Sequence, residues 1–157
     1  MPEVNHLLLI DDGSSDATVA VIRAWQKSHA DQAVTLLELT RNFGKEAAML
    51  AGLDYAHGRC AAAVLIDSDL QHPPERIPAM VQAWRNGAEV VTAVRDDRDA
   101  EGLVKVATAS WFYRVFNRLV DSIQLQEGAG DFRLLSAPVV EAVTQLREAT
   151  RFSKGLM

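Results

Sequence analysis

Residues 61–74 read AAAVLIDSDLQHPP, and this stretch decides the fold class. Its first six residues are apolar, so the strand that they predict is buried on both faces, as a parallel strand covered by helices is. Asp67 and Asp69 follow at once, and Pro73 and Pro74 then end the strand and can open a helix. The stretch therefore predicts a buried strand with acidic side chains at its carboxyl end.

Short apolar runs alternate with helical patterns along the whole chain. Further strands are expected over residues 6–10, 34–39, 89–94 and 132–135. Helices are expected after residue 15, over 46–56, through 77–84, along 104–123 and from near 138 to a point before 151. This alternation predicts one α/β domain over residues 1–157 with a mainly parallel sheet.

Composition excludes several classes of protein. The 157 residues include 16 basic and 21 acidic side chains, a formal net charge of −5, so we expect no nucleic-acid partner. Cys60 is the only cysteine, which excludes an internal disulfide and a cysteine-based zinc site. The longest apolar run, residues 61–66, is far shorter than the roughly 20 residues of a membrane-spanning helix. We expect this chain to be soluble and cytoplasmic.

Polar side chains gather where the predicted strands end. Those that follow strands are Asp11 with Asp12, Arg41, Asp67 with Asp69, and Arg95. Because ligands of parallel sheets bind beyond the carboxyl ends of the strands, these residues predict one shared site.

Asp67 and Asp69 give the sharpest chemical signal. Two neighbouring carboxylates repel each other, so they are best accommodated around a hard cation such as Mg²⁺ or Mn²⁺, which could bridge a diphosphate. The alternative is a solvated turn in which Asp69 caps the following helix.

Three further features suggest binding of an anionic ligand. Asp11 or Asp12, in a turn with Gly13, could hydrogen-bond a base or ribose, and helix capping alone is the alternative. Asp131 follows glycines that would let a backbone approach a ligand, although it could be a simple turn residue. The basic pairs are Arg41 with Lys45, Arg95 with Arg98, and Arg151 with Lys154, which would either capture phosphate or be merely solvated. No dinucleotide-binding glycine motif or Walker A sequence follows a strand.

Seven segments in order resemble the inverting family-two glycosyltransferases with a GT-A fold. They are LIDDGSSD (9–16), RNFGKE (41–46) continuing to AGLD (51–54), DSDLQHPPE (67–75), Val94-Arg95 with Arg98, FYR (112–114), GDFRL (130–134) and RFSKG (151–155). The closest resemblance is to the polyprenyl-phosphate branch, which includes bactoprenol glucosyltransferases and dolichol-phosphate mannose synthases. It implies a Rossmann-like sandwich.

The resemblance also implies roles for individual residues. Asp11 and Asp12 would meet the nucleotide, Asp67 and Asp69 would hold Mg²⁺ or Mn²⁺ at the diphosphate of a UDP- or GDP-linked sugar, and Gln71 would accompany them. Arg95 would contact phosphate, Arg151 and Lys154 would lie on a flexible loop that closes over the phosphates, and Asp131 would be the catalytic base. A phosphate monoester, with a second pKa of about 6, is already mostly dianionic at neutral pH, so positioning is the easier role for Asp131 to fulfil.

The implied reaction transfers a sugar to a polyprenyl phosphate with inversion. Members of the family begin with one more strand and continue into an amphipathic region and transmembrane helices, so we expect this chain to be truncated at both ends. The full-length protein would act at the cytoplasmic face of the membrane. Two alternatives stay open. One is a remnant with weak or no nucleotide-sugar binding, and the other is a response-regulator receiver in which Asp67 is the phosphoacceptor and Lys105 serves as the downstream lysine.

Overall fold

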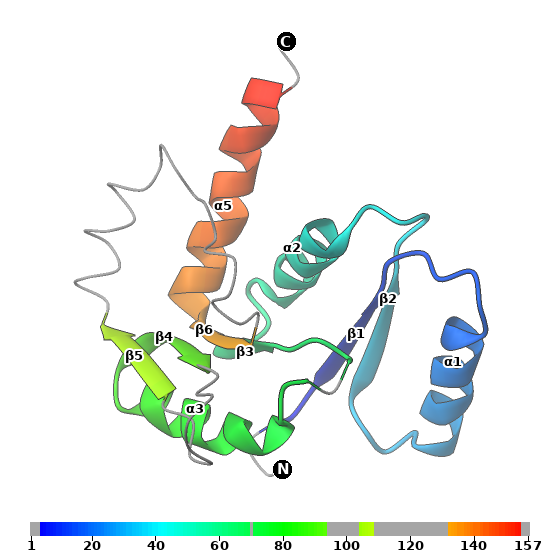
Figure 1. Cartoon of the computed structure of the whole chain (residues 1–157), viewed down its shortest axis with the longest axis horizontal. Coiled ribbons are helices and arrows are strands. Elements are labelled where there is room, and N and C mark those ends of the chain that lie inside the picture. Colours follow the sequence, from blue (N-terminus) through cyan, green and yellow to red (C-terminus); the bar gives the residue numbers. More distant parts are fainter. Residues whose placement is uncertain (1–3, 70, 94–103, 109–131, 155–157) are drawn as a thin grey trace. The chain divides into compact units, whose positions relative to one another are not determined.

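The structure, a computed structural model, describes residues 4–69, 71–93, 104–108 and 132–154, with only the backbone described over 104–108 and 146–154. The chain divides into two compact units, Met1–His57 and Gly58–Met157. Each unit is described by itself below (Figure 1).

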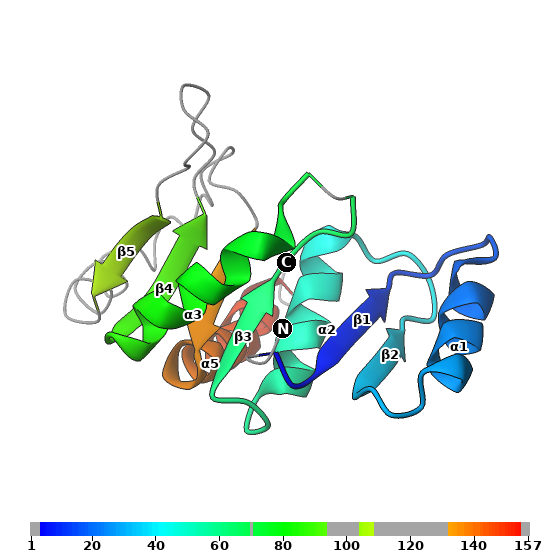
Figure 2. The same cartoon turned by 90° about the horizontal axis from the view of Figure 1, so that it is seen from below.

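The first unit is a β–α–β–α segment. Strands β1 (Leu7–Asp11) and β2 (Val34–Glu38) pair in parallel from Leu7↔Val34 to Asp11↔Glu38. Helices α1 (Thr18–Ser28) and α2 (Lys45–Ala56) follow the two strands. Because both strands run the same way, both end at one edge of the sheet, and the turns that follow them begin there (Figure 2).

The two helices of this unit contact its strands in different ways. A Cβ atom at Gly52 of α2 would lie 2.4 Å from Cδ1 of Ile10, so the helix contacts β1 where only a glycine fits without displacing that side chain. On α1, Arg23 forms an exposed ion pair with Glu38 of β2, with 2.7 Å between Nη2 and Oε1. An exposed pair of this kind contributes about 0.2–1 kcal/mol, so it orients α1 more than it stabilises the fold.

The second unit is built on a four-stranded sheet in the order β3-β6-β4-β5. Its elements are β3 (Ala62–Leu65), the short 3₁₀ helix η1 (Pro74–Arg76), α3 (Ile77–Arg85), β4 (Ala88–Ala93), β5 (Val104–Thr108), β6 (Arg133–Ser136) and α5 (Ala137–Lys154). Strand β6 is antiparallel to both of its neighbours, so β3 and β4 point in the same direction on either side of it (Figure 2).

One apolar core holds α3 against this sheet. Ile77, Met80 and Val81 repeat at helical spacing on α3 and are all buried. They pack with Val91 of β4 and Leu134 of β6, both fully buried, in a single cluster. Of the two strands that carry this core, β6 pairs directly with β3, the strand that precedes Asp67.

The α/β class is confirmed, and two details differ from expectation. Parallel pairing occurs between β1 and β2, whereas every pairing that the structure describes in the four-stranded sheet is antiparallel, because β6 enters between β3 and β4. The expected helix over residues 104–123 is wrong for its first five residues, which form strand β5. Val104 and Val106 are β-branched residues in alternation, and pairing with β4 overrides the helical spacing. Residues 109–123 lie outside the described residues.

Candidate functional site

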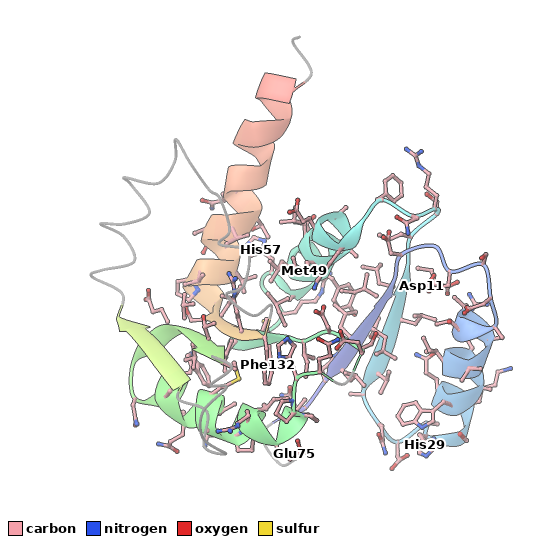
Figure 3. The ribbon with its side chains drawn as sticks, viewed as in Figure 1. Asp11, His29, Met49, His57, Glu75 and Phe132 are labelled. Atoms are coloured by element: carbon pink, nitrogen blue, oxygen red, sulfur yellow. The ribbon has the colours of Figure 1, made fainter. Side chains whose placement is uncertain are left out.

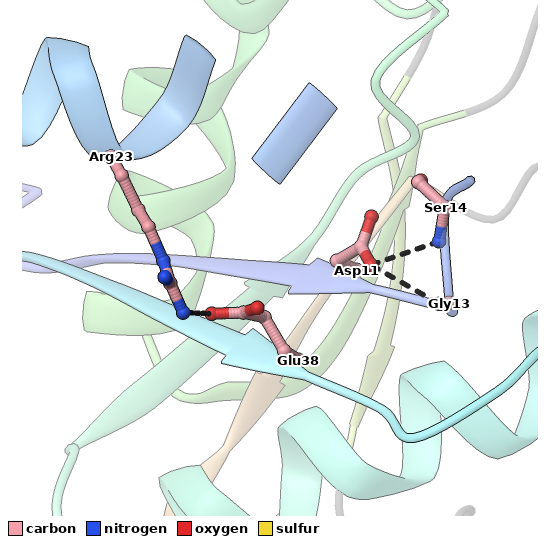
Figure 4. Close-up of polar contacts among 5 residues, drawn as sticks. All are labelled: Asp11, Gly13, Ser14, Arg23 and Glu38. Carbon is pink, nitrogen blue, oxygen red and sulfur yellow. Dashed lines mark hydrogen bonds and ion pairs between the residues drawn. The ribbon is translucent and has the colours of Figure 1, made fainter. Parts of the chain in front are cut away.

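Asp11 is the last residue of β1 and the only charged residue that is buried among those the structure describes. Its side chain is only 6% exposed, and its Oδ2 accepts hydrogen bonds from the backbone N–H groups of Gly13 at 3.2 Å and Ser14 at 3.0 Å (Figure 4). Bonds from Ser14, first its hydroxyl and then its N–H, lower the pKa of Asp11 below its ordinary value. The carboxylate is therefore ionised and shapes the turn after β1.

Asp12 points to a different part of the chain. Its Oδ1 accepts the backbone N–H of Phe43 at 2.8 Å, and its Oδ2 accepts that of Gly44 at 2.9 Å. Phe43 and Gly44 belong to the turn that follows β2, here called the 41–44 turn. Asp12 thus ties the turn after β1 to the turn after β2.

Gly13 lets these two turns meet. Its φ is +74°, and a Cβ atom there would lie 2.4 Å from the carbonyl carbon of Arg41 and 2.6 Å from the nitrogen of Asn42. Both are backbone atoms that cannot rotate away, so any other residue would force the turns apart. Within the first unit, the turn after β1 therefore meets the turn that begins at Arg41.

The 41–44 turn presents an exposed cation on an aromatic ring. The guanidinium carbon of Arg41 lies 4.7 Å from the ring centroid of Phe43, and the Phe43 side chain is 49% exposed. Such stacking restricts the arginine without using its in-plane N–H donors. Phe43 and Gly44 are not among the predicted site residues. Their backbone N–H groups bond to Asp12, which is more than thirty residues away in the sequence, and a contact at that distance produces no local sequence pattern.

In the second unit, Asp67 and Asp69 follow the end of β3, with Ile66 between the strand and Asp67. Asp67 is half-buried and Asp69 is exposed. Oδ1 of Asp69 accepts the backbone N–H of Gln71 at 3.0 Å, which folds the segment into a local turn. No cluster of three or more acidic, histidine or cysteine side chains suited to a metal ion occurs among the described residues.

Three strand ends meet at the edge of the sheet where Asp67 and Asp69 stand. Arg133, the first residue of β6, pairs with Leu65 near the end of β3 on one side and with Thr92 near the end of β4 on the other. The carbonyl of Phe132 accepts the N–H of Ala93 at 3.0 Å, which continues this junction. The carboxyl ends of β3 and β4 and the amino end of β6 therefore share one edge.

His72 anchors the acidic segment to that edge. Its ring centroid lies 5.6 Å from that of Phe132. The Phe132 side chain, labelled in Figure 3, is fully buried. Phe132 was predicted only as part of a strand. Its role could have been inferred from its position in the sequence, because a large aromatic residue directly after Asp131 is suited to anchor that segment in the core.

Four predicted site residues cannot be placed by their side chains. Arg95 and Asp131 lie outside the described residues. Arg151 and Lys154 lie in the last turn of α5, so the expectation that the helix ends before Arg151 and that both residues belong to a loop is wrong. Their side chains are not described. Helix α5 continues to Lys154 because residues 139–154 contain no proline or glycine that would end it.

No helix within the described residues has the length and apolar character to cross a membrane.

A mannosyltransferase, PcManGT from Pyrobaculum calidifontis in complex with GDP-Man and Mn²⁺, has a similar fold, with a TM-score of 0.56 and 23% identity. The match covers 88% of this chain and 37% of that one, and it shows a likeness of fold.

Two curated proteins are similar to this chain in sequence. The bactoprenol glucosyl transferase of Shigella phage SfV is 45% identical over 152 residues, which are 97% of this chain and 48% of that protein. The prophage bactoprenol glucosyl transferase homolog of Escherichia coli (strain K12) is 44% identical over the same length and coverage. The chain spans about half the length of these curated relatives. The model of the family described as Glycosyl transferase family 2 matches residues 2–144, so the chain belongs to glycosyl transferase family 2.

Proposed function

We propose that this chain is part of a transferase that moves a sugar from a nucleotide-diphosphate sugar to a polyprenyl phosphate at the cytoplasmic face of a membrane. The observation that carries the proposal is the edge of the second unit, where Asp67 and Asp69 follow β3 beside the end of β4 and the start of β6. The names of the relatives support glucose as the sugar and a bactoprenol-linked acceptor. Family membership removes the support for a receiver domain.

Each unit contributes residues to this proposed activity. In the first unit, Asp11 and Asp12 shape the turns assigned to the nucleotide. In the second, Asp67, Asp69 and Gln71 are assigned to the diphosphate. Arg95 comes two residues after β4 in the sequence and Asp131 two residues before β6, so the shared edge favours placing both beside Asp67. Arg151 and Lys154 are assigned to the phosphates.

Mg²⁺ or Mn²⁺ fits the donors that this chain offers after β3. Both ions prefer carboxylate oxygens, and Asp67 and Asp69 supply them within one short segment. The bond from Gln71 N–H to Oδ1 of Asp69 fixes the orientation of that carboxylate and leaves its other oxygen for a cation. When bound, the ion would neutralise negative charge on the leaving diphosphate.

The reaction needs positioning more than proton transfer. An oxygen of the acceptor phosphate attacks the anomeric carbon while the bond from that carbon to the diphosphate oxygen breaks, and the nucleoside diphosphate leaves with the electron pair. One displacement inverts the anomeric configuration. Because the acceptor is mostly dianionic at neutral pH, Asp131 is assigned to orienting it, and Arg95 to stabilising the leaving group.

Calorimetric titration with UDP-glucose and GDP-mannose, with Mn²⁺ and with EDTA, tests this proposal. We expect Mn²⁺-dependent binding of one donor, and we expect Asp69→Ala to weaken it by about tenfold or more, as loss of a charged ligand group does. Asp31→Ala, an exposed acidic residue in the turn before β2, is the matched control and should bind like the wild type. Absence of donor binding by the wild type would favour the inactive remnant, and binding indifferent to Mn²⁺ and to Asp69 would refute the metal assignment.

A further inference from the structure

The carboxylate of Asp12 is committed to the 41–44 turn. Oδ1 accepts the N–H of Phe43 at 2.8 Å and Oδ2 accepts that of Gly44 at 2.9 Å, so one side chain holds two consecutive backbone amides. Hydrogen bonds to an ionised acceptor are stronger than neutral ones. This is the arrangement expected of a group that fastens a loop.

A second contact fixes the same turn from the backbone side. The residue next to Asp12 is Gly13, whose missing Cβ would lie 2.4 Å from the carbonyl carbon of Arg41. Within the turn, Oδ1 of Asn42 also accepts the N–H of Gly44 at 3.1 Å. The turn after β2 is thus held by a side chain, by backbone contact and by its own internal bond.

Arg41 is the residue that this fastening places. Its guanidinium lies over the ring of Phe43, whose N–H is one of the two that Asp12 binds. Among the described residues, Arg41 forms no ion pair with a carboxylate. Its N–H donors therefore suit a phosphate oxygen of an anionic ligand.

We propose that Asp12 is a positioning residue: it fastens the 41–44 turn and thereby places Arg41 for the nucleotide sugar, instead of contacting the nucleotide itself. This inference rests on the proposed function for the identity of the ligand. The fastening itself rests only on contacts within the first unit.

Amide hydrogen exchange on the ligand-free chain tests the fastening. We expect Asp12→Ala to speed exchange at Phe43 and Gly44 by about tenfold or more, as loss of a charge-assisted bond does, and Asp12→Asn, which keeps one acceptor oxygen, to have a smaller effect. Asp16→Ala is the matched control, because the Asp16 carboxylate accepts the N–H of Thr18 in the same loop. It should change exchange at Thr18 and leave Phe43 and Gly44 unchanged. Unchanged exchange at Phe43 and Gly44 in both Asp12 variants would overturn the proposal.

Donor binding by the single and double variants tests the route through Arg41. If Asp12 acts by placing Arg41, Asp12→Ala combined with Arg41→Ala should bind no more weakly than Arg41→Ala alone. Losses that multiply in the double variant would mean that Asp12 contacts the donor directly, and the proposal would be wrong. If the wild type binds no nucleotide sugar, the proposed function fails, while the exchange experiment still decides whether Asp12 fastens the turn.

Discussion

Asp11 and Asp12 are neighbours in sequence and have different tasks in the structure. Asp11 is buried and binds the N–H groups of its own turn, whereas Asp12 binds those of a turn more than thirty residues away. Side chains of consecutive residues at a strand end point to opposite sides, which explains how one pair serves both purposes. A single acidic residue at this position could shape one turn but could not join the two.

The hydrogen bonds of Asp11 make the stability of the first unit depend on pH. Because the folded pKa lies below the ordinary value of 3.8, Asp11 contributes its full stabilisation above that value and loses it as the pH falls through the folded pKa. We expect the wild type to be more stable than Asp11→Asn at neutral pH, and the difference to shrink only below 3.8. Urea unfolding midpoints of both proteins across the acidic range provide the measurement.

Ser14→Ala is the companion variant for this experiment. It removes the hydroxyl that makes the largest contribution to the lowered pKa of Asp11, so the loss of stability below pH 3.8 should be smaller than in the wild type and complete at a higher pH. A stability difference between wild type and Asp11→Asn that stays constant through the whole acid range would contradict a lowered pKa.

At the scale of elements, the sequence located most strands and helices because burial leaves a local pattern. The apolar run at 61–66 and the spacing of Ile77, Met80 and Val81 were sufficient to predict β3 and α3. The sequence also predicted that Asp11, Asp12 and Arg41 would meet, since parallel strands end together. It could not predict β5, whose pairing with β4 is a tertiary contact, nor the bonds from Asp12 to distant amides.

The contact between His72 and Phe132 joins two elements and leads to a prediction. His72, three residues after Asp69, packs its ring on the fully buried ring of Phe132, the residue just before β6. Removing it in His72→Ala should loosen the segment that carries Asp67 and Asp69 and weaken Mn²⁺-dependent donor binding by several-fold, about the value of one aromatic contact. His72→Phe keeps a ring of similar shape and should retain wild-type affinity.

Titration with donor and Mn²⁺, alongside urea unfolding, separates positioning from simple stability. We expect His72→Ala to lose affinity for the donor clearly while its urea unfolding midpoint changes little. The change in midpoint should be small because His72 is only half-buried. If His72→Phe binds as weakly as His72→Ala, ring packing is not what positions the acidic segment.

At the scale of the whole molecule, charge determines how an anionic ligand can bind. The chain carries a formal net charge of −5, and two of its most prominent acidic pairs, Asp11 with Asp12 and Asp67 with Asp69, are assigned to a ligand that is itself negative. The first pair avoids repulsion because backbone N–H groups satisfy its carboxylates. In the second pair, one oxygen of Asp69 accepts the Gln71 N–H, and we assign a cation to offset the repulsion between the two carboxylates and the diphosphate.

This difference between the two units predicts how they respond to a ligand. With saturating donor and Mn²⁺, amide exchange should slow in both units, around the 41–44 turn in the first and around Gln71 and His72 in the second. With EDTA in place of Mn²⁺, protection near Gln71 should disappear, because the repulsion between Asp67, Asp69 and the diphosphate is no longer neutralised. Protection near the 41–44 turn should persist at higher donor concentration, since the amides bound by Asp12 require no metal. Protection that is confined to one unit even with Mn²⁺ would show that the two sets of residues do not serve the same ligand.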